Sequence, residues 1–396
     1  MLRKSNLQLV EAPAFFRREQ PIFSTGTEAD AHSLHQLVPM PARVHPDFVS
    51  FFIEKYSRKD DIVLDPFCGT GAVGLELALA GRIPFLSDNS ELMLRIARAK
   101  LEPADITEVT LALQQINSKR PIDATAFAKY FGSFFDIQTF QEICNLKDGV
   151  AERADRITRF VEAVLFGVLH GNSAGFLSSY TNPLQALSPV EQDQQNYTRR
   201  QRPDYRPVSP RVLRKTALLL RDGTPSVLLR SSSKKKIALA DARDLSFVRG
   251  GEAGLILTNP PLPGEDSSFQ SQWLRHWAAG ISDNGVKGAE FLSLTQWLDF
   301  MNAVLVELAR VTRFGVRAVL LLPEEFSVRA SADSQPTLST PEKVLIDMVE
   351  SELGFFWQAE GSWVNMRKSN AVAQNFRSSS ARRQEERSVA LVLRRR

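Results

Sequence analysis

DIVLDPFCGTGAVGLELALAGRIPFLSDNSELMLRIARAKL, residues 61–101, carries the pattern that predicts the fold of this chain. Ile62–Leu64 is a short apolar run rich in β-branched residues, and a glycine-rich turn follows it. Ala72–Ala80 has the composition of a helix, Gly81 ends it, and Ile83–Leu86 is a second apolar run. A strand, turn, helix and strand in this order predict a parallel α/β sheet.

Apolar runs beyond residue 233 predict the rest of the sheet. Lys236–Ala240, Gly254–Leu257 and Val316–Leu322 have the length and composition of strands. Near the end of the chain, Phe355–Val364 and Ser388–Leu393 predict two antiparallel strands that close a mixed sheet.

Residues 102–233 interrupt this alternation. They contain helical patterns such as Arg153–Leu169 and form a block that is too long for a loop within a compact domain. We therefore predict an irregular arm over residues 1–30, a sheet domain made of residues 31–101 and 234–396, and a mostly helical subdomain inserted between its two parts.

Composition excludes several classes of protein. The chain has 396 residues, of which 43% are hydrophobic and 24% charged, as is typical of a globular protein with one or two domains. Two cysteines and five histidines, without CxxC or HxxxH spacing, predict neither a metal site nor a disulfide framework. No apolar run approaches the roughly 18 to 20 residues that span a bilayer. We therefore expect a cytoplasmic protein without membrane contact.

Positive charge is concentrated in two segments. Residues 196–236 carry eight Arg and four Lys against two Asp, and residues 367–396 carry nine cations against two Glu. The net charge of the whole chain is only +4, so the remainder is acidic. Lys and Arg gain affinity for polyanions by releasing counterions from phosphates, so this pattern predicts a nucleic-acid-facing surface. A solvated basic face without a partner is the alternative interpretation.

The motif Asp65-Pro66-Phe67-Cys68-Gly69-Thr70-Gly71 lies where the first strand gives way to a helix. Glycines there let the backbone approach a ligand closely, and Asp65 can bind a polar or cationic group at the carboxyl end of its strand. Asp88 follows 23 positions later, at the end of the second strand, where a carboxylate can accept hydrogen bonds from both hydroxyls of a ribose.

DPFCGTG resembles the S-adenosylmethionine loop of the amino-methyltransferases that modify DNA bases. Its spacing is not GxGxxG and it lacks GKS or GKT, which argues against a nicotinamide site and a P-loop. The resemblance implies a Rossmann-like sheet and a set of cofactor-binding residues, with Asp88 on the ribose and Asp241 on the adenine amino group. The complete set is Asp65, Pro66, Phe67, Gly69, Gly71, Asp88 and Asp241.

Asn259-Pro260-Pro261-Leu262 matches three of the four positions of the family's catalytic motif, [D/N/S]-P-P-[Y/F/W]. An exocyclic amine is a poor nucleophile, and hydrogen bonds to the Asn oxygen and to the carbonyl of Pro260 would turn its lone pair toward the methyl donor. The aromatic residue of the motif stacks on the flipped base. Leu262 cannot do so, which leaves Phe269 or Trp273 as candidate replacements.

The order of loop motif, insertion and catalytic motif resembles that of a bacterial and phage subgroup whose target-recognition region lies between the motifs. His32–His35, Pro41–Pro46, Leu169–Ser173 and Phe269–Gly280 extend the resemblance. Basic residues of the insertion are therefore predicted to contact DNA phosphates. They are Arg199, Arg200, Arg202, Arg206, Arg211, Arg214 and Lys215.

Together these features predict an S-adenosylmethionine-dependent methyltransferase that modifies an exocyclic amino group of a DNA base, with adenine N6 favoured over cytosine N4. Three alternatives stay open: an RNA amino-methyltransferase, a catalytically silent methyltransferase-like protein that binds nucleic acid, and a metabolic enzyme on the same fold. The oligomeric state and a partner restriction nuclease are left open as well.

Overall fold

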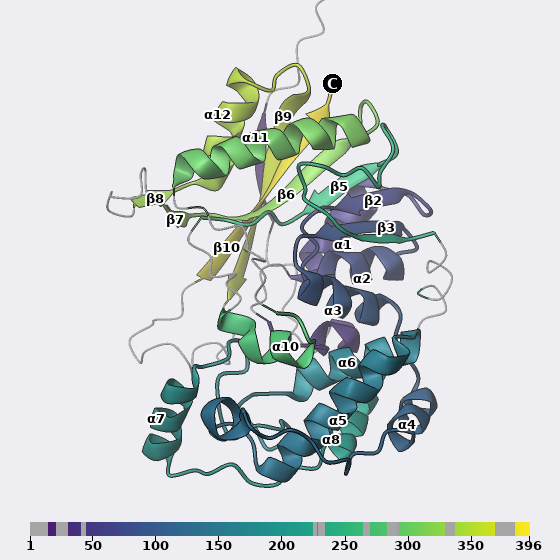
Figure 1. The fold of residues 1–396 in the computed structure, drawn as a ribbon. Helices are drawn as coiled ribbons and strands as arrows, with labels where there is room; N and C mark the ends of the chain where they lie inside the picture. The colour runs from purple at the N-terminus through teal and green to yellow at the C-terminus, as the bar shows by residue number, and fades with distance from the viewer. Residues whose placement is uncertain are drawn as a thin grey trace, which may run out of the picture.

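The structure is a computed structural model that describes residues 15–20, 31–40, 45–224, 228, 234–263, 270–282, 291, 293–328, 337–368 and 385–396. Within these ranges an eight-stranded sheet forms the centre of the molecule (Figure 1). Its strands, in the order in which neighbours pair, are β1 (Phe16–Gln20), β9 (Trp357–Lys368), β10 (Glu385–Arg395), β6 (Arg317–Pro323), β5 (Leu255–Thr258), β2 (Ile62–Asp65), β3 (Ile83–Asp88) and β4 (Lys236–Leu239).

The strand order makes the sheet Rossmann-like. The chain runs outward from β2 to β3 and β4, then returns to the other side of β2 for β5 and β6, and all these pairs are parallel. Strand β10 is antiparallel to both β6 and β9, which confirms the predicted mixed sheet. The order reverses between β2 and β5, and ligands of open α/β sheets bind at the carboxyl ends of the strands at such a point.

Side chains of the central strands alternate between two apolar cores because successive residues of a strand point to opposite faces. Leu64, Ile256 and Leu320 join one core, whereas Val63 and Leu255 join the other. The first core is covered by α11 (Leu294–Val311) and α12 (Pro341–Ser351), and the second by α1 (Pro46–Tyr56) and α2 (Ala72–Leu79).

A third apolar core joins the inserted helices to β3 and to the helices that follow β2 and β3. Between residues 102 and 224 the structure has helices, turns and a single isolated bridge, Gly171 to Tyr180, as expected for a mostly helical insertion. Figure 1 shows its helices gathered at one end of the molecule, together with α10 (Trp273–Ala278). They follow α3 (Glu91–Leu101) and are α4 (Ile106–Gln114), α5 (Ile137–Arg153), α6 (Arg156–Val168), α7 (Pro189–Arg199) and α8 (Val208–Leu219).

Part of the predicted irregular arm is a strand. β1, Phe16–Gln20, pairs in parallel with β9, and the Phe16 ring packs edge-on against Trp363. Gly361 permits this approach, since a Cβ there would lie 2.5 Å from the Phe16 carbonyl oxygen. The strand is polar and short, so its stability comes from pairing with β9. A contact with so distant a segment cannot be predicted from local periodicity. A second, two-stranded sheet pairs β7 (Phe326–Val328) with β8 (Thr337–Ser339).

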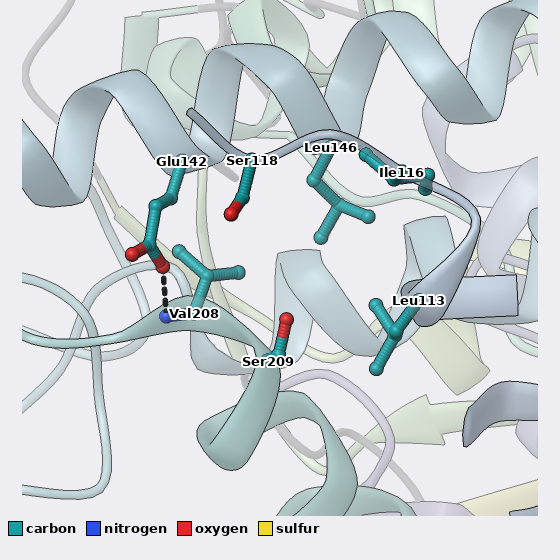
Figure 2. Close-up of a pocket in the computed structure, with 7 residues that line it drawn as sticks. All are labelled: Leu113, Ile116, Ser118, Glu142, Leu146, Val208 and Ser209. Carbon is teal, nitrogen blue, oxygen red and sulfur yellow. Dashed lines mark hydrogen bonds between the residues drawn. The ribbon is translucent and has the colours of Figure 1, made fainter. Parts of the chain in front are cut away.

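A small cavity lies inside the helical part, between α4, α5 and α8 (Figure 2). Its volume of about 10 Å³ has room for one water molecule at most. Glu142 at its edge accepts a hydrogen bond of 2.7 Å from the backbone N–H of Val208. At this volume the cavity is a packing defect and not a ligand site. Within the described ranges, every helix is too short or too polar to span a bilayer.

Candidate active site

The glycine turn after β2 leaves one side open for a ligand. Gly69 and Gly71 have φ values of +49° and +76°, which favour glycine. A Cβ on Gly71 would lie 2.9 Å from the Cβ of Ala97 on α3, so this residue is needed for close helix packing. A Cβ on Gly69 would meet nothing within 4 Å. Gly71 therefore fixes the turn against the fold, and Gly69 presents open backbone at the switch point.

Asp88 holds the turn in place. One of its carboxylate oxygens accepts from the backbone N–H of Gly69 and the other from that of Ser90, each at 2.9 Å. The backbone N–H of Cys68 donates to the carbonyl of Ser87 at 3.0 Å. Asp88 therefore ties the loop to β3.

Asp65 is a buried carboxyl at the end of β2. Its Oδ1 accepts from the Thr258 hydroxyl at 2.6 Å and from the backbone N–H of Phe67 at 3.2 Å. Within the described ranges no hydrogen bond reaches Oδ2. Burial raises the pKa of Asp65 to about 7, the two hydrogen bonds oppose the rise, and the negative charge of Asp88 adds to it. A cationic ligand group beside Oδ2 would favour the ionised form.

Asn259 is oriented by β6. Its Nδ2 donates to the carbonyl of Leu321 at 2.5 Å, and because a carbonyl only accepts, the amide oxygen must point away from that strand. The carbonyl of Pro261 accepts from the indole N–H of Trp297 at 2.8 Å. Among the described residues, no donor reaches the Asn259 Oδ1 or the Pro260 carbonyl. The segment therefore presents two acceptors side by side along the chain.

Leu262 lies in the apolar core and does not line an open surface on which a base could stack. Its exposed fraction is 6%, and it belongs to the cluster that includes Trp297 of α11 and Phe326. The core therefore encloses a smaller side chain at the position where the family's motif has an aromatic residue.

We expect Leu262→Tyr to destabilise the protein and not to increase its activity. The larger side chain would overpack the core beside Trp297, at a cost of about 1–3 kcal/mol. Urea unfolding and methyl transfer, measured beside the volume-conserving Leu262→Met, would check this. Unchanged stability together with faster transfer would show that position 262 faces the substrate.

The other candidate aromatic residues do not lie at the motif. Phe269 falls outside the described residues, and Trp273 packs between Phe131 and Phe134 while donating to the carbonyl of Leu187. Trp273 therefore belongs to the helical part.

Two half-buried rings of the α11 region that we did not predict lie near the glycine turn instead. Phe67 packs against Phe300 at 5.9 Å between ring centroids, and Phe300 against Phe291 at 5.0 Å.

Asp241 follows β4 as expected, but its carboxylate already has a partner. Both of its oxygens accept from the Arg243 side chain, at 2.6 to 3.2 Å, and this pairing lowers the pKa of Asp241. The Arg243 guanidinium lies 5.5 Å from the centroid of the Phe300 ring. A ligand amino group at Asp241 would share the carboxylate with Arg243. The two residues are close in the sequence, so their ion pair could have been predicted from it.

Segments upstream of the loop brace α2. His35 Nε2 lies 2.6 Å from one oxygen of Glu76, and the Ser50 hydroxyl donates to the other at 2.8 Å. Lys100 of α3 is 2% exposed, and its amine lies 3.5 Å from the Thr70 hydroxyl. Burial lowers the pKa of Lys100 to about 8. Residues 41–44, part of the segment Pro41–Pro46 that extends the family resemblance, lie outside the described residues.

The basic residues of the insertion divide into two groups. Arg199, Arg200, Arg202 and Arg214 are exposed, and in the described part of the chain no carboxylate lies within 4 Å of their guanidinium nitrogens. The other three support the fold. Arg206 binds the carbonyls of Phe176 and Ser178 and pairs with Asp204, Arg211 binds the carbonyl of Pro207, and Lys215 binds that of Gln36. These three side chains make backbone contacts within the fold, and their contact with phosphates stays a prediction.

We expect Arg206→Ala to lower the free energy of unfolding by roughly 2–4 kcal/mol, because it leaves one buried and one part-buried carbonyl without this donor and removes a side chain that is 7% exposed. Arg199→Ala, at an exposed position, is the matched control and should change stability little. Urea denaturation of both variants would decide. Equal stability would return Arg206 to the candidates for nucleic-acid contact.

The strand order and the open glycine turn define a Rossmann-like α/β protein with a candidate ligand site at the carboxyl ends of β2, β3 and β5. No protein-family model matches the chain, and no curated protein does. Among solved structures, an S-adenosylmethionine-dependent methyltransferase from Methanosarcina mazei aligns over 89% of this chain and 98% of its own, with 10% identity and a TM-score of 0.33.

Two further structures illustrate the range of similar proteins. An rRNA methyltransferase from Streptomyces viridochromogenes aligns over 75% of this chain and 82% of its own, with 13% identity and a TM-score of 0.30. A Thermus thermophilus protein described as a DNA modification methylase, in complex with S-adenosyl-L-methionine, aligns over 39% of this chain and 53% of its own, with 17% identity and a TM-score of 0.23. Similarity this low does not bear on activity.

Proposed function

We propose that this chain is an S-adenosylmethionine-dependent methyltransferase that modifies an exocyclic amino group of a DNA base. The pair of acceptors at the catalytic motif is the observation that carries the proposal. Asn259 Nδ2 donates to Leu321 and the Pro261 carbonyl accepts from Trp297, and we infer that Asn259 Oδ1 and the Pro260 carbonyl accept from a substrate amine. Two hydrogen bonds from the amine to these oxygens would orient its lone pair toward a methyl donor.

The cofactor suits the residues that surround the turn. Asp65 Oδ2 would bind its ammonium group, the open backbone at Gly69 would lie against the amino-acid part, and Asp88 would accept from the ribose. Asp241 would accept from the adenine amino group while it stays paired with Arg243. Bound there, S-adenosylmethionine supplies an electrophilic methyl group, and the chain contributes orientation and acceptors.

DNA is the proposed partner because the insertion presents exposed cations. Arg199, Arg200, Arg202 and Arg214 would contact phosphates, and the exposed side of α7 carries Tyr197, which is 88% exposed. Adenine N6 remains our first choice of target and cytosine N4 our second. An RNA amino-methyltransferase is the second candidate function, because acceptors of this kind serve any base amine.

The test separates cofactor binding from transfer. S-adenosylmethionine is titrated calorimetrically into the full chain, and transfer of its labelled methyl group to genomic DNA and to total RNA is measured in parallel. Labelled DNA, digested to nucleosides, would support the proposal and name the base, whereas labelled RNA alone would favour the second candidate. Binding without transfer to either would favour a silent relative that binds nucleic acid. Absence of binding would overturn the assignment of Asp65, Asp88 and Asp241.

The salt dependence of the protein's affinity for DNA tests the proposed nucleic-acid partner independently of methyl transfer. Displacement of counterions makes nucleic-acid affinity fall steeply with salt, by a slope of about −0.9 per phosphate contact on duplex DNA. A flat response would favour a metabolic enzyme on the same fold.

A further inference from the structure

Thr258 occupies the junction of the two halves of the site. Strands β2 and β5 are parallel neighbours, with Val63 opposite Leu255 and Leu64 opposite Ile256, so Asp65 and Thr258 meet where both strands end. The Thr258 hydroxyl donates to Asp65 Oδ1 at 2.6 Å. Thr258 is 0% exposed and Asp65 1% exposed. The contact is therefore a short hydrogen bond that water does not reach.

This hydrogen bond decides which oxygen of Asp65 is left for a ligand. The backbone N–H of Phe67 donates to the same Oδ1, and within the described ranges Oδ2 makes no hydrogen bond. Both donors thus hold the carboxyl from one side. A ligand ammonium is left with the opposite oxygen.

The backbone continues from Thr258 directly into the amine-accepting segment. Asn259 is anchored on the far side by its hydrogen bond to Leu321 on β6, 62 residues later in the chain. Thr258 and Asn259 therefore bridge β2 and β6 through β5. A shift of the Asp65 carboxyl would be transmitted along one residue to the two acceptors.

We propose that Thr258 is a positioning residue that couples the ammonium-binding carboxyl of Asp65 to the amine-accepting oxygens of Asn259 and Pro260. The inference rests on the proposed function and extends it to a residue outside both sequence motifs. It implies that removal of one hydroxyl changes cofactor binding although Thr258 itself touches no ligand.

Thr258→Val keeps the shape of the side chain and removes the donor. A hydrogen bond to a carboxylate favours its ionised form, so the variant should hold Asp65 protonated to higher pH. Besides burial, the charge of Asp88 raises the pKa of Asp65, and the charges of both carboxylates raise the pKa of the buried Cys68 thiol; the variant alters neither Asp88 nor Cys68. At neutral pH we expect cofactor affinity to fall by about 10-fold to 100-fold, and the loss to shrink as pH rises.

Two readouts test the inference, one with ligand and one without. Thermal unfolding of the ligand-free protein and calorimetric titration of S-adenosylmethionine are followed between about pH 5 and pH 9 for the wild type, Thr258→Val and Thr258→Ser. Thr216→Val on α8 is the matched control, because Thr216 is also 0% exposed and its hydroxyl has no hydrogen-bond partner in the described part of the chain.

The expected result is that Thr258→Val moves both pH profiles upward, while Thr258→Ser and Thr216→Val leave them in place. Coincident profiles for Thr258→Val and the wild type in the ligand-free protein would overturn the inference whatever the protein binds. A shifted ligand-free profile in a protein that binds no S-adenosylmethionine would overturn the proposed function, and with it the coupling, but would leave the hydrogen bond standing.

Discussion

Asn259→Ala is expected to lower the rate constant of methyl transfer by about a hundredfold to a thousandfold, while cofactor affinity changes little. Removal of one preorganised hydrogen-bonding group from a transition state costs this much in other enzymes. Here the lost group is the amide oxygen, which the Leu321 carbonyl turns away from β6 and which we propose accepts from the substrate amine. Single-turnover transfer to DNA, with S-adenosylmethionine titrated into the same preparation, would measure both quantities.

Asn259→Asp makes the test sharper. The family motif admits Asp at this position, yet here the side chain must also donate to Leu321, and a carboxylate placed 2.5 Å from a carbonyl oxygen would be repelled. We therefore expect Asn259→Asp to lose transfer as well, and Asn302→Ala, whose amide bonds to Glu352 on the outer side of α11, to retain it. Full transfer by Asn259→Ala would mean that the amine is held elsewhere.

Asp65→Asn is expected to weaken S-adenosylmethionine binding by more than about a hundredfold at pH 8, because it removes the charge that would pair with the ligand ammonium in a buried site. Wild-type affinity should rise with pH until the carboxyl is ionised, by about tenfold per unit below its pKa of about 7. Calorimetric titration across this range would check both statements. Equal pH profiles for the two proteins would remove Asp65 from the site.

The same carboxyl also sets a direction for stability. Its pKa is about 7 in the folded chain, above the ordinary value of 3.8, so the folded state binds the extra proton between these values. The free energy of unfolding should therefore fall as pH rises from about 4 to 7, by roughly 4 kcal/mol from this group, and stay level above. Asp65→Asn should lack this fall. Urea unfolding at several pH values would measure this change. A free energy of unfolding that rises over the same range would contradict the prediction.

Several elements could be predicted from local sequence because their signals are local. The β-branched apolar runs placed the strands β2 to β6, and the glycine after α2 placed the end of that helix, to within a few residues. The residue types of the glycine turn and of Asn259-Pro260-Pro261 also led to the candidate site. Local rules failed for β1, whose five residues are stabilised by pairing with a strand more than 300 residues away.

The roles of the individual basic side chains and of Leu262 could be assigned only from the tertiary structure. A run of arginines predicts a polyanion surface, but Arg206 and Lys215 are drawn into contacts with carbonyls from distant segments. Leu262 follows the two prolines as a motif residue, yet it packs into the core beside α11. In each case the residue contacts a segment that is distant in the sequence, and the neighbouring residues do not indicate that contact.

The sequence by itself determined the order of strands β2 to β6, β9 and β10, the glycine turn and the kinds of atom available at the site, because covalent geometry and short-range periodicity decide these. Only the tertiary structure decided which atoms remain for a ligand. The hydrogen bonds from Thr258 to Asp65 and from Asn259 to Leu321 join residues 193 and 62 positions apart. Such contacts arise when separate strands pack into one sheet, so they depend on the folded arrangement of the whole chain.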